Sequence, residues 1–280
     1  MKRNPFFPLL TLFTGMMCIT ACSDNNSNTA TSWTITIADT IHNDTTRTLT
    51  DAGRWMLNSW DVGQTVFVTS TNLSTYYGKL TAQQAGLATT LYGTVSDEAA
   101  KLKVGDSLLI SGPSSVYKEG VGLVYDFSEQ DGLLSTIEKR YAYNNEKVAV
   151  KEIDATNKLI KTTSSKFVHQ QSMMGITFYD KYSAQAINVK SIVFSSQSGR
   201  LIQKEIVGGE KTYGDIKVIL ATPTTSKVYI CFKTDNFDLD AYTLTVTDNN
   251  GTKWSVSSRA VLANNVYYPL KVPVKEIEEE

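Results

Sequence analysis

The chain has 280 residues, of which 27 are basic and 28 acidic, so its net charge is −1. No excess of positive charge points to nucleic acid, and an apolar fraction of 41% excludes a disordered chain. Three cysteines and two histidines argue against a disulfide scaffold, a cysteine-rich zinc module and most histidine-dependent enzymes.

The N-terminus is predicted to be an export signal. Lys2 and Arg3 precede an apolar run over 6–19 that is too short to cross a bilayer. The sequence Ile19-Thr20-Ala21-Cys22 resembles a bacterial lipobox, in which the cysteine thiol receives a diacylglycerol. The alternative is an ordinary secretory signal cut near Ala21. We therefore expect a lipoprotein signal peptide at 1–21, lipidation at Cys22 and a flexible polar tether over 22–32.

The segments that follow alternate apolar and polar residues with a period of two, which predicts half-buried β-strands. In the first half the predicted strands cover 34–37, 64–71, 89–95, 107–110, 121–127 and 148–153, and 134–141 is a short helix or an irregular connection. In the second half they cover 175–179, 186–195, 215–220, 227–233, 242–247, 252–257 and 266–274. Asn250-Gly251 predicts a tight hairpin turn between two of them.

The polar stretch 154–165 is interpreted as the boundary between two domains. The short, regularly spaced strands on both sides of it predict an all-β chain with two tandem β-sandwiches. The expected N-terminal domain covers 33–155 and the C-terminal domain 156–280.

Residues that could carry chemistry are few. The chain contains no nucleophile elbow, phosphate loop, dinucleotide fingerprint or zinc-protease motif, and Gly120-Val121-Gly122 is interpreted as a turn. The acidic run 235–240 lacks the glycine and distal glutamate of a calcium loop, so a solvated loop is favoured. His169 is interpreted as structural, and Cys231 as a small buried apolar residue. We expect no enzymatic activity, no cofactor and no metal.

Tryptophans leave a second interpretation open. Trp55, Trp60 and Trp254 could form an aromatic platform for a glycan on a surface-anchored lipoprotein. The five-residue spacing of the first two, around apolar neighbours, is more typical of a packed core.

The segment before Arg47 suggests a strand that can be removed. The strand-like stretch 33–41 carries Trp33, Ile35, Ile37 and Ile41 and is followed by a polar stretch ending near Arg47. If this strand fills a groove, cleavage after Arg47, or after Arg54 as second choice, would expose a template for a strand from another chain. Its four apolar side chains would contribute about 6–12 kcal/mol as an upper estimate. The alternative is that Arg47 is an ordinary loop residue.

Four stretches lie at 55–68, at 125–132 followed by 141–143, at 167–178 and at 267–272, and together they cover most of the chain. In this order they resemble the fimbrillins, pilus subunits of Gram-negative anaerobes. The second contains the Gln130-Asp131-Gly132 motif. In the third, Gly175 stands where arginine or lysine is usual in the family.

The resemblance implies two transthyretin-like β-sandwich domains and a precursor anchored in the outer membrane by lipid. It implies trimming by an arginine-specific protease at Arg47 or Arg54. The groove is then filled by a donor strand from another pilin subunit, in a cell-surface pilus that serves adhesion to a host or bacterial receptor. The donor in shaft subunits is a C-terminal extension, whereas here only the short stretch 273–280 extends from the end of the last predicted strand. Tip, anchor and accessory positions therefore stay open beside the shaft.

Overall fold

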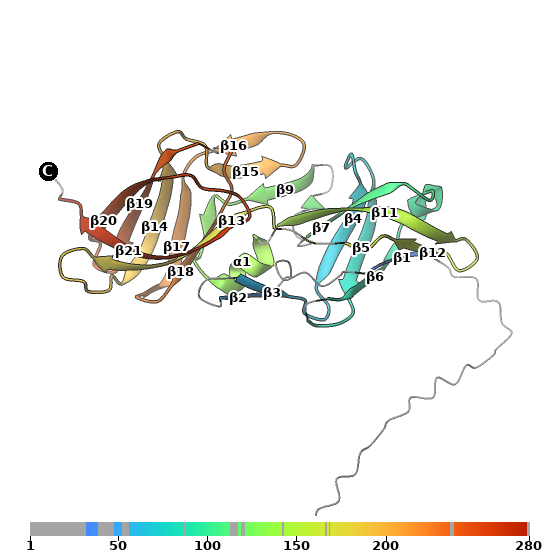
Figure 1. The fold of residues 1–280 in the computed structure, drawn as a ribbon, viewed down its shortest axis with the longest axis horizontal. Helices are drawn as coiled ribbons and strands as arrows, with labels where there is room; N and C mark the ends of the chain where they lie inside the picture. The colour runs from blue at the N-terminus through green and yellow to red at the C-terminus, as the bar shows by residue number, and fades with distance from the viewer. Residues whose placement is uncertain are drawn as a thin grey trace, which may run out of the picture.

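The structure is a computed structural model that describes residues 32–38, 48–51, 56–86, 88–112, 117–118, 121–141, 143–165, 167, 169–235 and 238–278. Almost all of its regular structure is β, which confirms the predicted all-β class (Figure 1). In the described part of the chain, no helix is long and apolar enough to cross a membrane.

The first unit is a barrel of seven strands. Going round it, β1 pairs with β12, and β11, β7, β4, β5 and β6 follow until β6 pairs with β1 again. The strands are β1 (Trp33–Ala38), β4 (Thr65–Ser70), β5 (Tyr76–Ala82), β6 (Thr90–Val95), β7 (Ser107–Gly112), β11 (Asn144–Asp154) and β12 (Leu159–Thr162), with the 3₁₀-helix η1 (Asp97–Lys101) between β6 and β7. The sequence predicts a β-sandwich here, and in the structure the pairing of β1 with β6 closes its sheet into a barrel.

The second unit is an eight-stranded sheet in the order β10-β17-β14-β19-β20-β21-β13-β18. Its strands are β10 (Glu129–Gln130), β13 (Ser172–Asp180), β14 (Val189–Ser196), β17 (Ile216–Thr224), β18 (Val228–Phe232), β19 (Asp240–Asp248), β20 (Lys253–Ala260) and β21 (Tyr267–Glu276). The predicted Asn-Gly hairpin joins β19 to β20, and Gly251 adopts the positive φ of 92° that such a turn requires.

The two units repeat one topology. In both, the first strand pairs in parallel with the last one (β1 with β12, β13 with β21) and antiparallel with the fourth (β6 and β18). The remaining order, β11-β7-β4-β5, corresponds to β20-β19-β14-β17. The difference lies at one ladder, because β5 pairs with β6 whereas the ladder order contains no direct pairing of β17 with β18.

Small elements from the first half of the chain complete the second unit. A four-stranded sheet joins β8 (Tyr117–Lys118) and β9 (Gly122–Asp126) to β15 (Ile202–Ile206) and β16 (Lys211–Tyr213). The helix α1 (Leu134–Arg140) lies with β9 between the two sheets in Figure 1. A separate hairpin is formed by β2 (Thr48–Asp51) and β3 (Met56–Ser59).

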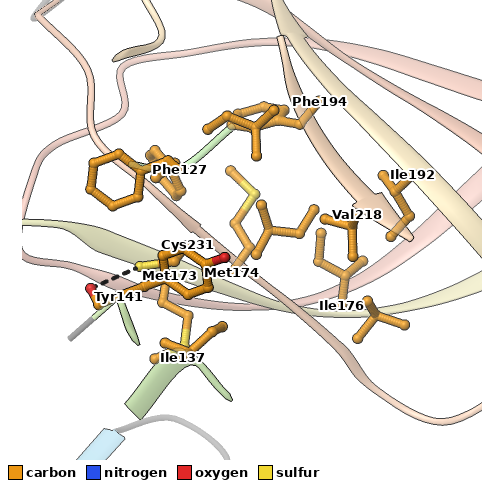
Figure 2. Close-up of a cluster of buried hydrophobic side chains, with 14 of the residues drawn as sticks. Phe127, Ile137, Tyr141, Met173, Met174, Ile176, Ile192, Phe194, Val218 and Cys231 are labelled. Atoms are coloured by element: carbon orange, nitrogen blue, oxygen red, sulfur yellow. Dashed lines mark hydrogen bonds between the residues drawn. The ribbon is translucent and has the colours of Figure 1, made fainter. Parts of the chain in front are cut away.

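Two apolar cores correspond to the two units. The barrel core contains Trp33, Ile35 and Ile37 of β1. The second core takes Phe127, Ile137 and other residues of the 123–143 segment in addition to those of β13, β14 and β17–β21. Figure 2 shows Phe127, Ile137 and Tyr141 facing Met173, Met174 and Cys231 in this second core.

The sheets therefore do not divide at residue 155. The polar stretch 154–165, interpreted as a linker, contains β12, which pairs with both β1 and β11 inside the barrel. Earlier in the chain, residues 122–143 belong mostly to the second unit. The sequence hides both features, because β12 is only four residues long and the 122–143 segment pairs with strands about 80 residues away.

Candidate strand-acceptor groove

The strand β1 occupies a groove between β6 and β12. All six of its residues pair antiparallel with β6, from Trp33 opposite Val95 to Ala38 opposite Thr90. On its other edge, residues 34–36 pair in parallel with β12. The Thr34 amide also donates to the Lys158 carbonyl at 2.9 Å. Both edges of the strand are thus engaged, as for an interior strand of a barrel.

The side chains of β1 alternate between the core and the outside. Ile35 and Ile37 are fully buried and Trp33 is 9% exposed, whereas Thr34 and Thr36 are half-buried. The period of two read from the sequence is confirmed over these residues. Transfer of the three apolar side chains from water contributes about 5–9 kcal/mol as an upper estimate. Removing β1 would leave an apolar trough with an unpaired backbone on both walls.

Glycine shapes the wall beside β1. Gly93 of β6 lies opposite Ile35, and a Cβ at this position would come within 2.1 Å of the Lys79 carbonyl oxygen. This close approach of β5 and β6 lets the barrel close around β1.

Several predicted site residues lie outside the described residues. They are Cys22, Ile41, Arg47, Arg54 and Trp55. The described residues nearest to the predicted cleavage positions are Ala38, where β1 ends, and Thr48, where β2 begins.

The aromatic platform is not supported at Trp60. This side chain is 1% exposed and packs edge-on against Phe167, with ring centroids 5.3 Å apart. Trp254 is half-buried against the second core, and its Nε1 donates to Asp248 Oδ2 at 3.3 Å. Both tryptophans are held by the fold and they do not form a shared platform. For Trp60 this agrees with its apolar sequence context.

A glutamine side chain completes the second unit at the place where β17 and β18 do not pair. Gln130 of β10 is 5% exposed, and its amide meets the backbone of Cys231 in β18. Its Nε2 donates to the Cys231 carbonyl at 2.6 Å, and its Oε1 accepts from the Cys231 amide at 2.8 Å. Because β10 also pairs with β17, the glutamine takes the place of a strand partner. We call residues 129–132 the glutamine latch.

Two further contacts hold the latch in place. The Tyr141 hydroxyl donates to the Glu129 carbonyl, and the Tyr229 amide donates to the Gly132 carbonyl at 3.0 Å. Gly132 has φ of 74°, and a Cβ there would lie 2.7 Å from Val228 Cγ1. The resemblance marked the Gln130-Asp131-Gly132 motif, but its role depends on a partner about 100 residues away and was not predicted.

Asp235, the first residue of the run considered as a calcium site, belongs to a charged cluster with side chains of β15 and β16 and with Lys233. Asp235 accepts from Lys211 Nζ at 2.9 Å and from the Tyr213 hydroxyl at 2.7 Å. Glu205, which is 7% exposed, pairs with Lys233 at 2.6 Å. Burial acts to raise the pKa of Asp235, but the hydrogen bonds from Tyr213 and Lys211 outweigh it and leave this pKa below its ordinary value. The cluster is an ion-pair network.

The remaining candidates, Cys231 and His169, lie in or beside the packed interior of the protein. Cys231 is fully buried, as predicted, and burial raises the pKa of its thiol well above the ordinary value. Its Sγ lies 3.6 Å from the Tyr141 carbonyl (Figure 2). His169 is half-buried beside Gln171. Among the described residues, no group of three or more histidine, cysteine or acidic side chains could hold a metal ion.

Comparisons with known proteins give a likeness of fold. No protein-family profile and no curated protein sequence matches the chain. A solved structure described as a "putative cell adhesion protein" of Bacteroides ovatus aligns with a TM-score of 0.52 at 12% identity, over 88% of this chain and 96% of that one. This likeness shows that the chain shares the fold of that protein.

Two further solved structures are less similar. A "putative cell adhesion protein" of Bacteroides uniformis has a TM-score of 0.48 at 14% identity, covering 88% of this chain and 95% of that one. A fimbrial assembly protein of Parabacteroides distasonis has a TM-score of 0.41 at 10% identity, covering 86% and 90%.

Proposed function

We propose that this protein is a fimbrillin-like subunit of a cell-surface pilus that serves adhesion. It is exported as a lipoprotein anchored in the outer membrane through Cys22, and its two units are tandem transthyretin-like β-sandwich domains. The proposal includes no catalytic role. It assembles when an arginine-specific protease removes β1 and a strand of another pilin subunit takes its place.

The observation that carries this proposal is the position of β1 in both the barrel and the chain. The strand fills a whole groove, yet every other strand of the barrel follows it in sequence. One backbone cut between 38 and 48 would separate β1 covalently from all of them. The equivalent strand of the second unit, β13, lies in mid-chain between β12 and β14, so it has no comparable route of release.

The groove also specifies what could replace β1. The incoming strand must run parallel to β12 and antiparallel to β6, and it must offer apolar side chains at every second position. Such a strand would satisfy both backbone walls and regain most of the burial of Trp33, Ile35 and Ile37. The last strand of this chain, β21, is engaged with β13 over eight residue pairs. We therefore assign the donor strand to another subunit.

Arginine-specific proteolysis of the folded, lipid-free protein tests the proposal. We expect one cut after Arg47, seen by intact mass, followed by species of high mass that persist in detergent until the sample is heated. Arg47→Ala should abolish both results, and Arg54→Ala, the matched control, should leave them unchanged. Resistance of the folded protein at both arginines would contradict the processing step.

A further inference from the structure

The second unit has an opening in its sheet that the barrel lacks. β20 and β21 pair only at Trp254 opposite Glu276 and Ser255 opposite Lys275. Beyond these pairs β20 stays paired with β19 as far as Ala260, and β21 stays paired with β13. In the described chain, the ladder between β20 and β21 therefore does not continue along 256–260 or 268–274. We call the opening between these two segments the β20–β21 slot.

The slot exposes part of the second core. It has a volume of about 370 Å³, and its floor is formed by core residues such as Phe194 and Leu244. Val256 and Leu270 on its two walls are only half-buried. Ser258 and Lys271 are the lining residues that are neither apolar nor aromatic. A site of this composition favours an apolar occupant.

The backbone of the two walls favours a polypeptide strand over a lipid. Both walls are β-strands whose facing edges stop pairing, and only another backbone can supply hydrogen bonds to both. The β20 wall offers amides and carbonyls, whereas the β21 wall contains Pro269 and Pro273, which lack an N–H, so a guest strand would bond to it mainly through its carbonyl acceptors. The slot is closed at one end by the two residue pairs and at the other by the 261–266 connection, where Leu262 is buried. The open part of β20, residues 256–260, is about 16 Å long at the usual rise per residue.

We propose that the β20–β21 slot accepts β1 of a second copy of this chain. β20 and β21 are antiparallel to each other, so any guest strand runs parallel to one and antiparallel to the other. β1 already occupies such an environment between β12 and β6. Its five residues 33–37 match the length of the slot, and Trp33, Ile35 and Ile37 present an apolar side chain at every second position.

This inference rests on the proposed function for its supply of free β1. Cleavage after Arg47 releases a segment that begins at the lipid-bearing Cys22 and includes β1. Docked in the slot of a processed subunit, that segment ties the subunit to the membrane without a covalent bond. The slot thereby gives the released strand a role in anchoring.

A synthetic peptide of residues 30–40 with a fluorescent end tests the slot directly. It is added to the intact, unprocessed protein, in which the covalently attached β1 keeps the barrel filled. Two neighbouring serines on opposite faces of β20 supply matched variants. Ser258 lines the slot, whereas the Ser257 hydroxyl lies 2.8 Å from that of Thr243 on the other face. Because both serines are exposed, the same Ser→Asp substitution places little demand on folding.

We expect saturable binding of the peptide, weakened at least about ten-fold by Ser258→Asp and unchanged by Ser257→Asp, because a charge in the slot must be desolvated. A peptide with Ile35→Asp and Ile37→Asp should not bind. Amides of 256–260 and the amides of 268–274 other than Pro269 and Pro273 should gain protection from hydrogen exchange. No saturable binding, equal binding to both serine variants, or binding of a fatty acid but not of the peptide would overturn the inference. Since the peptide is supplied ready-made, such a failure would leave the processing step untouched.

Discussion

Replacing Gln130 by alanine should destabilise the second unit more than a single surface hydrogen bond would suggest. The substitution removes the side-chain amide that bonds to both backbone groups of Cys231. Cys231 is fully buried, and within the described residues β13 is the one strand that pairs with β18. Neither water nor another strand is therefore in place to replace the glutamine at this edge. The amide and carbonyl of Cys231 would be left without a partner in a buried position.

The magnitude follows from these two groups. A buried backbone donor or acceptor left unsatisfied costs about 1–3 kcal/mol, so Gln130→Ala should cost about 2–6 kcal/mol. That is a large share of the roughly 5–15 kcal/mol that stabilises a typical domain. The matched control is Gln203→Ala, which removes an exposed hydrogen bond to the Asp215 carbonyl that water can replace. This control should cost less than about 1 kcal/mol.

Two readouts report on the second unit. Urea unfolding followed by near-ultraviolet circular dichroism gives the free energy of unfolding, and the reaction of Cys231 with a thiol reagent reports the opening of β18. The other two cysteines are replaced by serine in all samples. Gln130→Ala should lower the urea midpoint and speed labelling of Cys231, while Gln203→Ala should do neither. A Gln130→Ala protein within about 0.5 kcal/mol of the parent, which is the range of ordinary surface substitutions, would refute the latch.

Three further predictions concern the barrel and the ion-pair network. Ile35→Ala should lower the free energy of unfolding by about 2–5 kcal/mol, because it opens a cavity beneath β1. Denaturant titration measures this loss, with the outward-facing Thr36→Ala as the control. Gly93→Ala should prevent barrel closure, since its Cβ would collide with the Lys79 carbonyl; a soluble variant with unchanged circular dichroism and unfolding midpoint would disprove this. Asp235→Asn should lower stability at neutral pH. The folded-state pKa of Asp235 lies below the unfolded value, so its contribution is present above the unfolded pKa, near 3.9, and is lost as pH falls through the folded one. The free energies of unfolding of the variant and the parent should thus converge as the pH is lowered. A difference that stays constant at all pH values would exclude this cause.

The sequence predicts most strands because they alternate in polarity and are bounded by turn residues. It fails at β5, where Gly78 and Lys79 interrupt the alternation, although Gly78 is required by the close approach to Thr94. It also fails at β12, where lysine and threonine dominate a strand that has only one fully buried residue, Ile160. Short strands with one buried position carry too weak a periodic signal to be recognised.

The candidate groove is predicted in part. The alternation over 33–37 identifies β1 and its buried face, and the structure confirms both. The parallel partner β12 could not be found, because parallel pairing over more than 100 residues leaves no local trace. The same reasoning applies to the glutamine latch, whose donor and acceptor are 101 residues apart. Long sequence separation also explains why the sequence does not reveal that the 122–143 segment belongs mostly to the second unit.

The central claim is that β1 can be separated from the barrel and replaced. Native mass spectrometry of the protein cut after Arg47 tests it most directly, with an isotopically labelled 22–47 segment, without lipid, added in excess. Both proteins carry Ser258→Asp, which weakens the β20–β21 slot. The account predicts that the cut protein exchanges its bound unlabelled segment for the labelled one, whereas the uncut protein takes up none. A barrel that cannot be cut between β1 and β2, or one that keeps its original segment after the cut under mildly destabilising conditions, would contradict it.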